Sequence, residues 1–227
     1  IYDPAREDQD SLVRGLFLTS WLVEDLLDTK GRFGAEACLI TSASSKTSIA
    51  LAHCVHQRGE MAGIGLTSPG NVAFCESLGC YDQVITYDAI TSLDAARPVV
   101  MVDMAGNGEV RSTAHHHFGD NMKFSLQVGI THYDETGSAD GLTVEEELPG
   151  ATPEFFFAPG HVQTRSAELG AAELMRRLTE AYVGFRQFSD DWLRIEESIG
   201  PEAVEQTYQA VLAGKTDPAS GQILSMD

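Results

Sequence analysis

A run of hydroxyl side chains with one lysine is the part of the sequence best suited to chemistry. In order, the run is Thr41, Ser42, Ala43, Ser44, Ser45, Lys46, Thr47 and Ser48. Hydroxyls donate hydrogen bonds, lysine carries a full positive charge, and the N–H groups that open a helix favour an anion. The run therefore predicts a phosphate-binding turn. The alternative is that Ser42 or Ser44 only caps the helix while Lys46 is solvated.

A second pair of hydroxyl residues, Thr67 and Ser68, follows the next apolar segment, which ends at Leu66. An NAD site has an Asp or Glu at this point to hold the ribose hydroxyls. This chain has neither, and the hydroxyls of Thr67 and Ser68 are compatible with the 2′-phosphate of NADP(H). No Arg or Lys follows, however, and the next polar side chain is that of Asn71.

A nucleoside-triphosphate loop is a rival interpretation of the first run. Ser45-Lys46-Thr47 matches the end of the G-x-x-x-x-G-K-[ST] pattern, whose glycines let the backbone wrap a phosphate. Ile40 and Ser45 stand at the two glycine positions. The sequence therefore disfavours a nucleoside triphosphatase.

The histidines offer little for a metal. His115, His116 and His117 are consecutive, so on a helix they point about 100° apart and cannot all face one ion. His53 and His56 have the spacing i, i+3, but no carboxylate or cysteine partner is evident near them. We predict no metal site.

His132 follows a segment that we expect to be a strand, residues 124–129. It should therefore lie on the ligand side of a parallel sheet, where a histidine can serve as an acid or a base near neutral pH. Alternatively, it hydrogen-bonds a loop carbonyl. No catalytic residue follows from the sequence.

Apolar segments that alternate with helical patterns must position these side chains. This alternation predicts an α/β fold, a Rossmann-type parallel sheet with helices on both faces, over residues 33–160, plus part of a second domain. The expected strands are 37–41, 62–66, 83–87, 98–103 and 124–129, and the expected helices are 46–58, 69–78 and 110–118.

The flanking segments complete the expected organisation. Residues 1–32 form a helical lead-in, with one helix or two short ones over 11–27, and residues 133–153 form an acidic loop. The C-terminal part, 161–227, has a long helix over 165–188, strands at 192–195 and 222–226, and a helix over 201–212.

Composition excludes several partners. The 227 residues include 34 acidic side chains against 15 Lys and Arg, a net charge of −19. Such a chain repels a nucleic-acid backbone, and no basic amphipathic helix suits anionic lipid. No signal peptide or apolar run of about 20 residues is present. The four cysteines form no C-x-x-C pair, so we expect reduced thiols and a cytoplasmic protein.

The spacing of particular residues resembles the coenzyme domain of medium-chain dehydrogenases/reductases, especially the NADP-using, quinone-oxidoreductase-like members. The resemblance rests on Leu39-Ile40-Thr41, Ala43-Ser44, Thr67-Ser68, Asn71, Phe74, Leu78-Gly79, Val84-Ile85 and Tyr87. The blocks Ala43-Ser44-Ser45-Lys46-Thr47 and Gly65-Leu66-Thr67-Ser68 are also similar to an uncharacterised family known only as a domain of unknown function. The resemblance extends over residues 11–227.

The resemblance implies a set of coenzyme-binding positions. Ser42, Ser45 and Ser48 stand at the positions of the glycine-rich turn, where all three glycines are replaced. The positions near the adenosine ribose or its 2′-phosphate are those of Thr67, Ser68, Asn71 and Tyr87, and the strand ends beside the nicotinamide include Asp103, Gly129 and Thr131.

The resemblance also implies a function. The chain would be an NADP(H)-binding oxidoreductase-like domain of unknown substrate, whose residues 161–227 pack on an N-terminal catalytic domain that precedes residue 1. Homodimers are common among such relatives. The alternative is a degenerate Rossmann module that binds another phosphorylated ligand or a protein partner without redox catalysis.

Overall fold

A six-stranded parallel sheet forms the centre of the molecule. The computed structural model describes residues 3–128 and 148–226. The strand order is β3-β2-β1-β4-β5-β6, and every pair is parallel. The strands are β1 (Ala37–Ile40), β2 (Ala62–Thr67), β3 (Gln83–Thr86), β4 (Val99–Asp103), β5 (Met122–Gln127) and β6 (Glu154–Phe155). The predicted α/β fold is confirmed.

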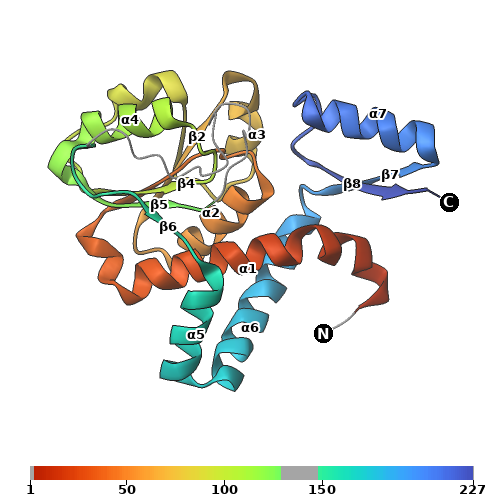
Figure 1. Cartoon of the computed structure of the whole chain (residues 1–227), viewed down its shortest axis with the longest axis horizontal. Helices are drawn as coiled ribbons and strands as arrows, with labels where there is room; N and C mark the ends of the chain where they lie inside the picture. The colour runs from red at the N-terminus through yellow and green to blue at the C-terminus, as the bar shows by residue number, and fades with distance from the viewer. Residues whose placement is uncertain (1–2, 129–147, 227) are drawn as a thin grey trace.

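Helices cover both faces of the sheet. They are α1 (Glu7–Thr29), α2 (Lys46–Arg58), α3 (Val72–Ser77), α4 (Gly108–Phe118), α5 (Ala158–Leu169), α6 (Ala171–Asp190) and α7 (Pro201–Leu212). Short 3₁₀ segments are η1 (Pro4–Arg6), η2 (Gly31–Gly34), η3 (Pro69–Asn71), η4 (Tyr87–Ser92) and η5 (Gly119–Asn121). In Figure 1, α4 lies above the sheet and α1 lies below it.

Two cores follow from the alternation of side chains along each strand. In β1, Cys38 and Ile40 pack with α1 and α2, whereas Ala37 and Leu39 pack with α4. All four side chains are fully buried. This explains why the strands are apolar throughout: a central parallel strand has no solvent-facing side.

The helix of residues 46–58 has the predicted bounds because both ends carry strong signals. Ser45 caps its start, and Gly59, with φ of 69°, ends it in the left-handed conformation that glycine tolerates best. The lead-in is one continuous helix, α1, rather than two.

One expectation for the later chain was wrong, and one strand has later bounds than expected. The single long helix predicted over 165–188 is two helices, because Gly170 has φ of 84° and separates α5 from α6. The strand expected at 192–195 is β7 (Arg194–Ile199). Strand β6 was not predicted, and the expected loop 133–153 lies mostly outside the described residues.

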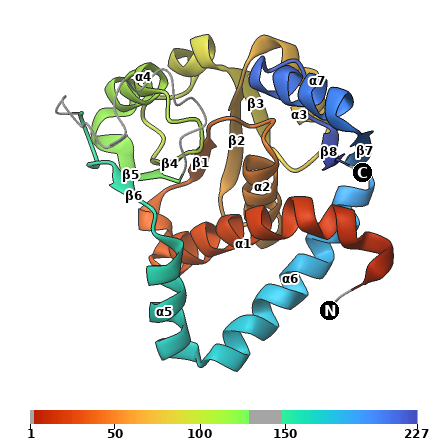
Figure 2. The ribbon, with the colours of Figure 1, turned by 45° about the vertical axis from the view of Figure 1, so that its right-hand side comes forward.

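The C-terminal residues form a small separate unit. β7 pairs in parallel with β8 (Ser220–Ser225), and α7 packs against both strands. In Figure 2 this unit lies to the right of the sheet, while α5 and α6 form a V below α1. Large apolar side chains stay exposed on it, including those of Ile199, Leu212 and Met226.

No helix in the described part of the chain is long and apolar enough to cross a membrane.

Candidate functional site

The turn between β1 and α2 lies at the carboxyl edge of the sheet, next to the point where the strand order changes direction. In open α/β sheets, ligands bind in the crevice at this point. The turn is compact: the Ser45 N–H donates to the Ser42 carbonyl over 2.7 Å, and the Ala43 N–H donates to the Leu66 carbonyl over 3.0 Å. Ser42 itself has φ of 52°, a conformation that usually favours glycine.

Two tyrosines fix the backbone of this turn. The Ser42 N–H donates to the Tyr87 hydroxyl over 3.1 Å, and the Tyr81 hydroxyl donates to the Ala43 carbonyl over 2.8 Å. Burial raises the pKa of both phenols, so they stay protonated. A Cβ on Gly65 would lie 2.9 Å from Ala43 Cβ and 3.0 Å from the Tyr81 ring, so this strand position needs glycine.

Two of the three serines that replace the glycines, Ser45 and Ser48, form hydrogen bonds within the turn. Ser45 caps α2, since its hydroxyl accepts from the Ser48 N–H over 3.2 Å. The Ser48 hydroxyl donates to the Thr41 carbonyl over 2.8 Å and is fully buried. The capping residue is therefore Ser45, and the alternative in which Ser42 or Ser44 caps the helix was wrong.

The first turn of α2 retains two backbone donors. Within residues 3–128 and 148–226, no hydrogen bond engages the N–H groups of Lys46 and Thr47. They stand at the positive end of the helix dipole, which favours an anion. The hydroxyl of Thr47 belongs to a half-buried side chain.

Lys46 is not solvated. Its ammonium donates to the carbonyls of Ser220 over 2.6 Å and of Pro218 over 3.4 Å, at the start of β8. Burial lowers the pKa of Lys46, and the charge of Asp217 partly offsets this effect. The predicted phosphate contact stays a prediction, because a phosphate would compete with these carbonyls.

Three polar side chains connect this turn to the end of β2. The Asn71 amide donates to the hydroxyls of Ser44 over 3.0 Å and of Ser68 over 3.2 Å. Ser68 is exposed, and the other two are half-buried. Because both hydroxyl oxygens accept here, their hydrogens remain to be donated outward. We call Ser44, Ser68 and Asn71 the hydroxyl–amide cluster. Thr67 is only 1% exposed and contacts the Cys75 thiol instead.

Asp103, predicted to lie beside a nicotinamide, is occupied by structural contacts. It is 1% exposed, and Oδ1 accepts from the Thr41 hydroxyl over 2.8 Å and from the N–H groups of Ala105 and Gly106. Arg111 donates to Oδ2 over 3.1 Å. The carboxylate therefore holds the turn after β4. Thr41 was predicted only as part of the hydroxyl run, and Tyr81 was not predicted to have a role in the site.

Three predicted positions, those of Gly129, Thr131 and His132, lie outside the described residues.

The neighbouring histidines of α4 contact other parts of the protein. His115 is buried between the Pro149 carbonyl and the Ser125 hydroxyl, each 2.9 Å away. His117 contacts the Leu93 carbonyl over 2.8 Å. In the described ranges, no three His, Cys, Asp or Glu side chains are grouped so that they could hold a metal ion.

The sheet order and the turn together define a class: this is a Rossmann-type α/β domain. The chain belongs to the family described as "Protein of unknown function (DUF2855)", whose model matches residues 1–217. No curated protein matches it.

Solved structures with the same fold include an enoyl reductase and a putative quinone reductase. The CurK enoyl reductase has a TM-score of 0.61 at 16% identity, over 92% of this chain and 60% of that chain. A putative NADPH:quinone reductase from Mesorhizobium loti has a TM-score of 0.61 at 16% identity, over 92% of this chain and 58% of that one.

The E. coli K-12 YhdH structure with bound NADPH gives a TM-score of 0.57 at 13% identity, over 93% of this chain and 61% of that chain. This chain thus spans about three fifths of the length of the reductases that it matches. Similarity at this identity shows the fold.

Proposed function

We propose that this chain is an NADP(H)-binding domain of medium-chain oxidoreductase type. The observation that carries the proposal is the hydroxyl–amide cluster at the end of β2, beside the crevice of a parallel sheet. Structures with NADPH bound, such as YhdH, support it by distant similarity of fold.

The donors at the turn fit the phosphates of NADP(H). The hydroxyls of Ser44 and Ser68 can donate to a 2′-phosphate while the Asn71 amide holds them in place. No Asp or Glu follows β2 to repel this phosphate or to prefer a free ribose. The N–H groups of Lys46 and Thr47 suit the pyrophosphate. The bound coenzyme would supply a hydride for reduction.

Close approach of the pyrophosphate requires that the three serines do not crowd it. Ser45 and Ser48 meet this requirement, since the Ser45 hydroxyl donates to Ser48 Oγ and the Ser48 hydroxyl donates to the backbone. Ser42 is tied to Tyr87 through its N–H. The turn is therefore rigid without its glycines.

Ligand-dependent melting tests the proposal. A ligand at about 100 times its Kd stabilises the folded state by about 2.7 kcal/mol. We expect NADPH to raise the melting temperature more than NADH does. Asn71→Asp, which places a negative charge in the cluster, should remove the difference, and Ser77→Ala on the exposed side of α3 should keep it. If neither coenzyme shifts the melting temperature at millimolar concentration, the proposal fails.

We also propose that residues 161–227 contact a catalytic domain of the medium-chain type. The apolar surface of β7, β8 and α7, which includes Ile199, Leu212 and Met226, supports this organisation. A two-stranded sheet alone is marginally stable in water. The catalytic residues and the substrate are unassigned.

The serines at the three glycine positions favour a second candidate, a Rossmann module without redox chemistry that binds another phosphorylated ligand. Glycines at these positions let the backbone approach a pyrophosphate closely, and this turn has none. Stabilisation by inorganic pyrophosphate, with no effect of NADPH or NADH, would select this candidate.

A further inference from the structure

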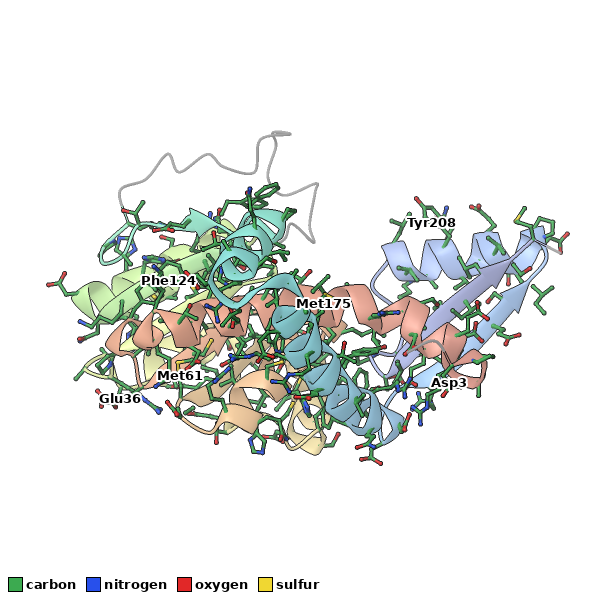
Figure 3. All side chains as sticks on the ribbon, turned by 90° about the horizontal axis from the view of Figure 1, so that it is seen from below. Asp3, Glu36, Met61, Phe124, Met175 and Tyr208 are labelled. Carbon is green, nitrogen blue, oxygen red and sulfur yellow. The ribbon has the colours of Figure 1, made fainter. Side chains whose placement is uncertain are left out.

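A cavity between α1, α2 and α6 lies at some distance from the crevice described above. Its volume is about 740 Å³, within the range of about 300–1,000 Å³ typical of small-molecule sites. Trp21 of α1, His53 of α2 and Phe188 of α6 line it. Figure 3 views the molecule from the side on which these three helices meet. His53 follows Lys46 by seven residues, about 10 Å along the axis of α2.

His53 is the unusual member of this lining. It is 8% exposed, and no hydrogen bond reaches its ring within the part of the chain that the structure describes. Aromatic contacts hold the ring: it stacks on Phe188 at 4.7 Å and meets the edge of Phe185 at 5.5 Å. In the described part of the chain, the Trp192 indole nitrogen is the only fully buried side-chain nitrogen or oxygen without a hydrogen-bond partner, so the ring nitrogens of His53 are not sealed in the core. Because His53 lines the cavity, its ring is suited to a partner that enters from there.

The ring of His53 is neutral at pH 7. Burial, aided by the charge of His56, lowers its pKa to about 4. A neutral imidazole has one N–H donor and one nitrogen acceptor. Its preferred partner therefore presents an acceptor or a donor, and it need not carry a charge.

The charged residues of the cavity disfavour an anion. Glu24 is 5% exposed, and both of its carboxylate oxygens accept from Arg58, so the charges of these two side chains neutralise each other. Glu180 and Asp191 add two further carboxylates to the lining. A phosphorylated ligand would be repelled here, unlike at the start of α2.

We propose that this cavity binds an uncharged, flat nitrogen heterocycle with a hydrogen-bond donor and acceptor on one edge, as in a nucleobase. The ring lies against Trp21 and Phe188, and its edge pairs with His53. The amides of Gln57 and Gln187, which also line the cavity, supply further donors and acceptors. The site is independent of coenzyme binding.

Two probes that differ in one ring atom test the recognition of the edge. 7-Azaindole has adjacent donor and acceptor nitrogens, whereas indole has the donor alone. We expect 7-azaindole to shift the Trp21 indole N–H signal of the ¹⁵N-labelled chain and to bind about tenfold more tightly than indole. Equal affinities for the two probes, or no shift with 7-azaindole at millimolar concentration, would overturn the proposal.

Matched variants locate the binding. A Cβ on Gly184 of α6 meets no atom within 4 Å, so Gly184→Leu fills the cavity without a clash and should abolish binding. Gly15→Leu, equally unhindered but on a different groove, should bind as the wild type does. His53→Leu should weaken 7-azaindole to the level of indole, and His56→Leu should not. Wild-type affinity in a folded Gly184→Leu chain would contradict the proposal.

Discussion

At the scale of residues, the Thr41 hydroxyl has a structural role in the site, because it connects two of the turns that form the crevice. It is fully buried; its hydroxyl donates to Asp103 and accepts from the N–H groups of Met104 and Ala105 at 2.8 and 3.1 Å. A single hydroxyl thus joins the end of β1 to the turn after β4. Buried polar groups that lose such a partner keep their desolvation cost.

Thr41→Val therefore removes the hydroxyl while keeping the shape. We expect the free energy of unfolding to fall by about 3 kcal/mol, because a buried carboxylate and two N–H groups lose a partner. Urea denaturation measures the change. Thr41→Ser keeps the hydroxyl and should cost much less; a Thr41→Val chain as stable as the wild type would contradict the role of the hydroxyl.

His53 predicts how stability depends on pH. Its pKa is about 4 in the folded chain against 6.5 when exposed. Below pH 6.5 the unfolded chain takes up a proton that the folded chain refuses, so stability is full above pH 6.5 and is lost as the pH falls. The loss from this group reaches about 3 kcal/mol by pH 4.

His53→Leu should flatten this part of the profile, and the comparison with wild type isolates the group from other titrations. His116→Gln, on the exposed surface of α4, should leave the wild-type slope. A slope that is unchanged in His53→Leu would show that another group carries it.

The sequence predicted part of the site. Ser44, Ser68 and Asn71 were each predicted as coenzyme-binding positions, and the structure brings the three side chains together at the carboxyl edge of the sheet. The sequence did not reveal that Tyr81 holds the turn or that Asp103 is sealed by Thr41. These are contacts across the sheet, and residue type alone does not say whether a carboxylate faces a ligand or a backbone.

At the scale of elements, helix α5 is held to α1 by one buried carboxylate. Asp25 Oδ2 accepts from Arg165 Nε over 2.7 Å and from His161 Nε2 over 2.8 Å, and these side chains are between 7% and 11% exposed. Burial acts to raise the pKa of Asp25, but hydrogen bonds from His161 and Arg165 outweigh it, so the pKa is lowered.

Asp25→Asn should lower the free energy of unfolding by about 3 kcal/mol, since a buried guanidinium loses its bidentate partner. Glu173→Gln provides the contrast. Glu173 pairs with Arg176 and Arg177 on the exposed surface of α6, where solvent screens the charges, so its denaturation midpoint should stay as in the wild type. Equal effects of the two substitutions would contradict the role of burial.

The elements were predicted where local signals agree. Ser45 and Gly59 bound α2, and apolar runs mark β1 to β5. The break at Gly170 was overlooked because apolar residues continue at helical spacing across it. Strand β6 has two residues, both exposed, and among the described strands it pairs with β5 alone, so its pattern is too short to detect.

At the scale of the whole molecule, the two proposed sites have opposite electrostatics on one acidic chain. The net charge is −19, yet the crevice presents hydroxyls and the positive end of α2, while the cavity contains three carboxylates against Arg58. The two proposals therefore call for different classes of ligand. The resemblance found in the sequence and the structure agree on a Rossmann-type fold.

The central claim is that the crevice recognises the 2′-phosphate of NADP(H) through Ser44, Ser68 and Asn71. Calorimetric titration with 2′,5′-ADP and with 5′-AMP tests it most directly, because the two nucleotides differ only in that phosphate. We predict that 2′,5′-ADP binds at least about tenfold more tightly, and that Ser68→Ala reduces this ratio. Equal affinities, or no binding of either nucleotide, would contradict the claim.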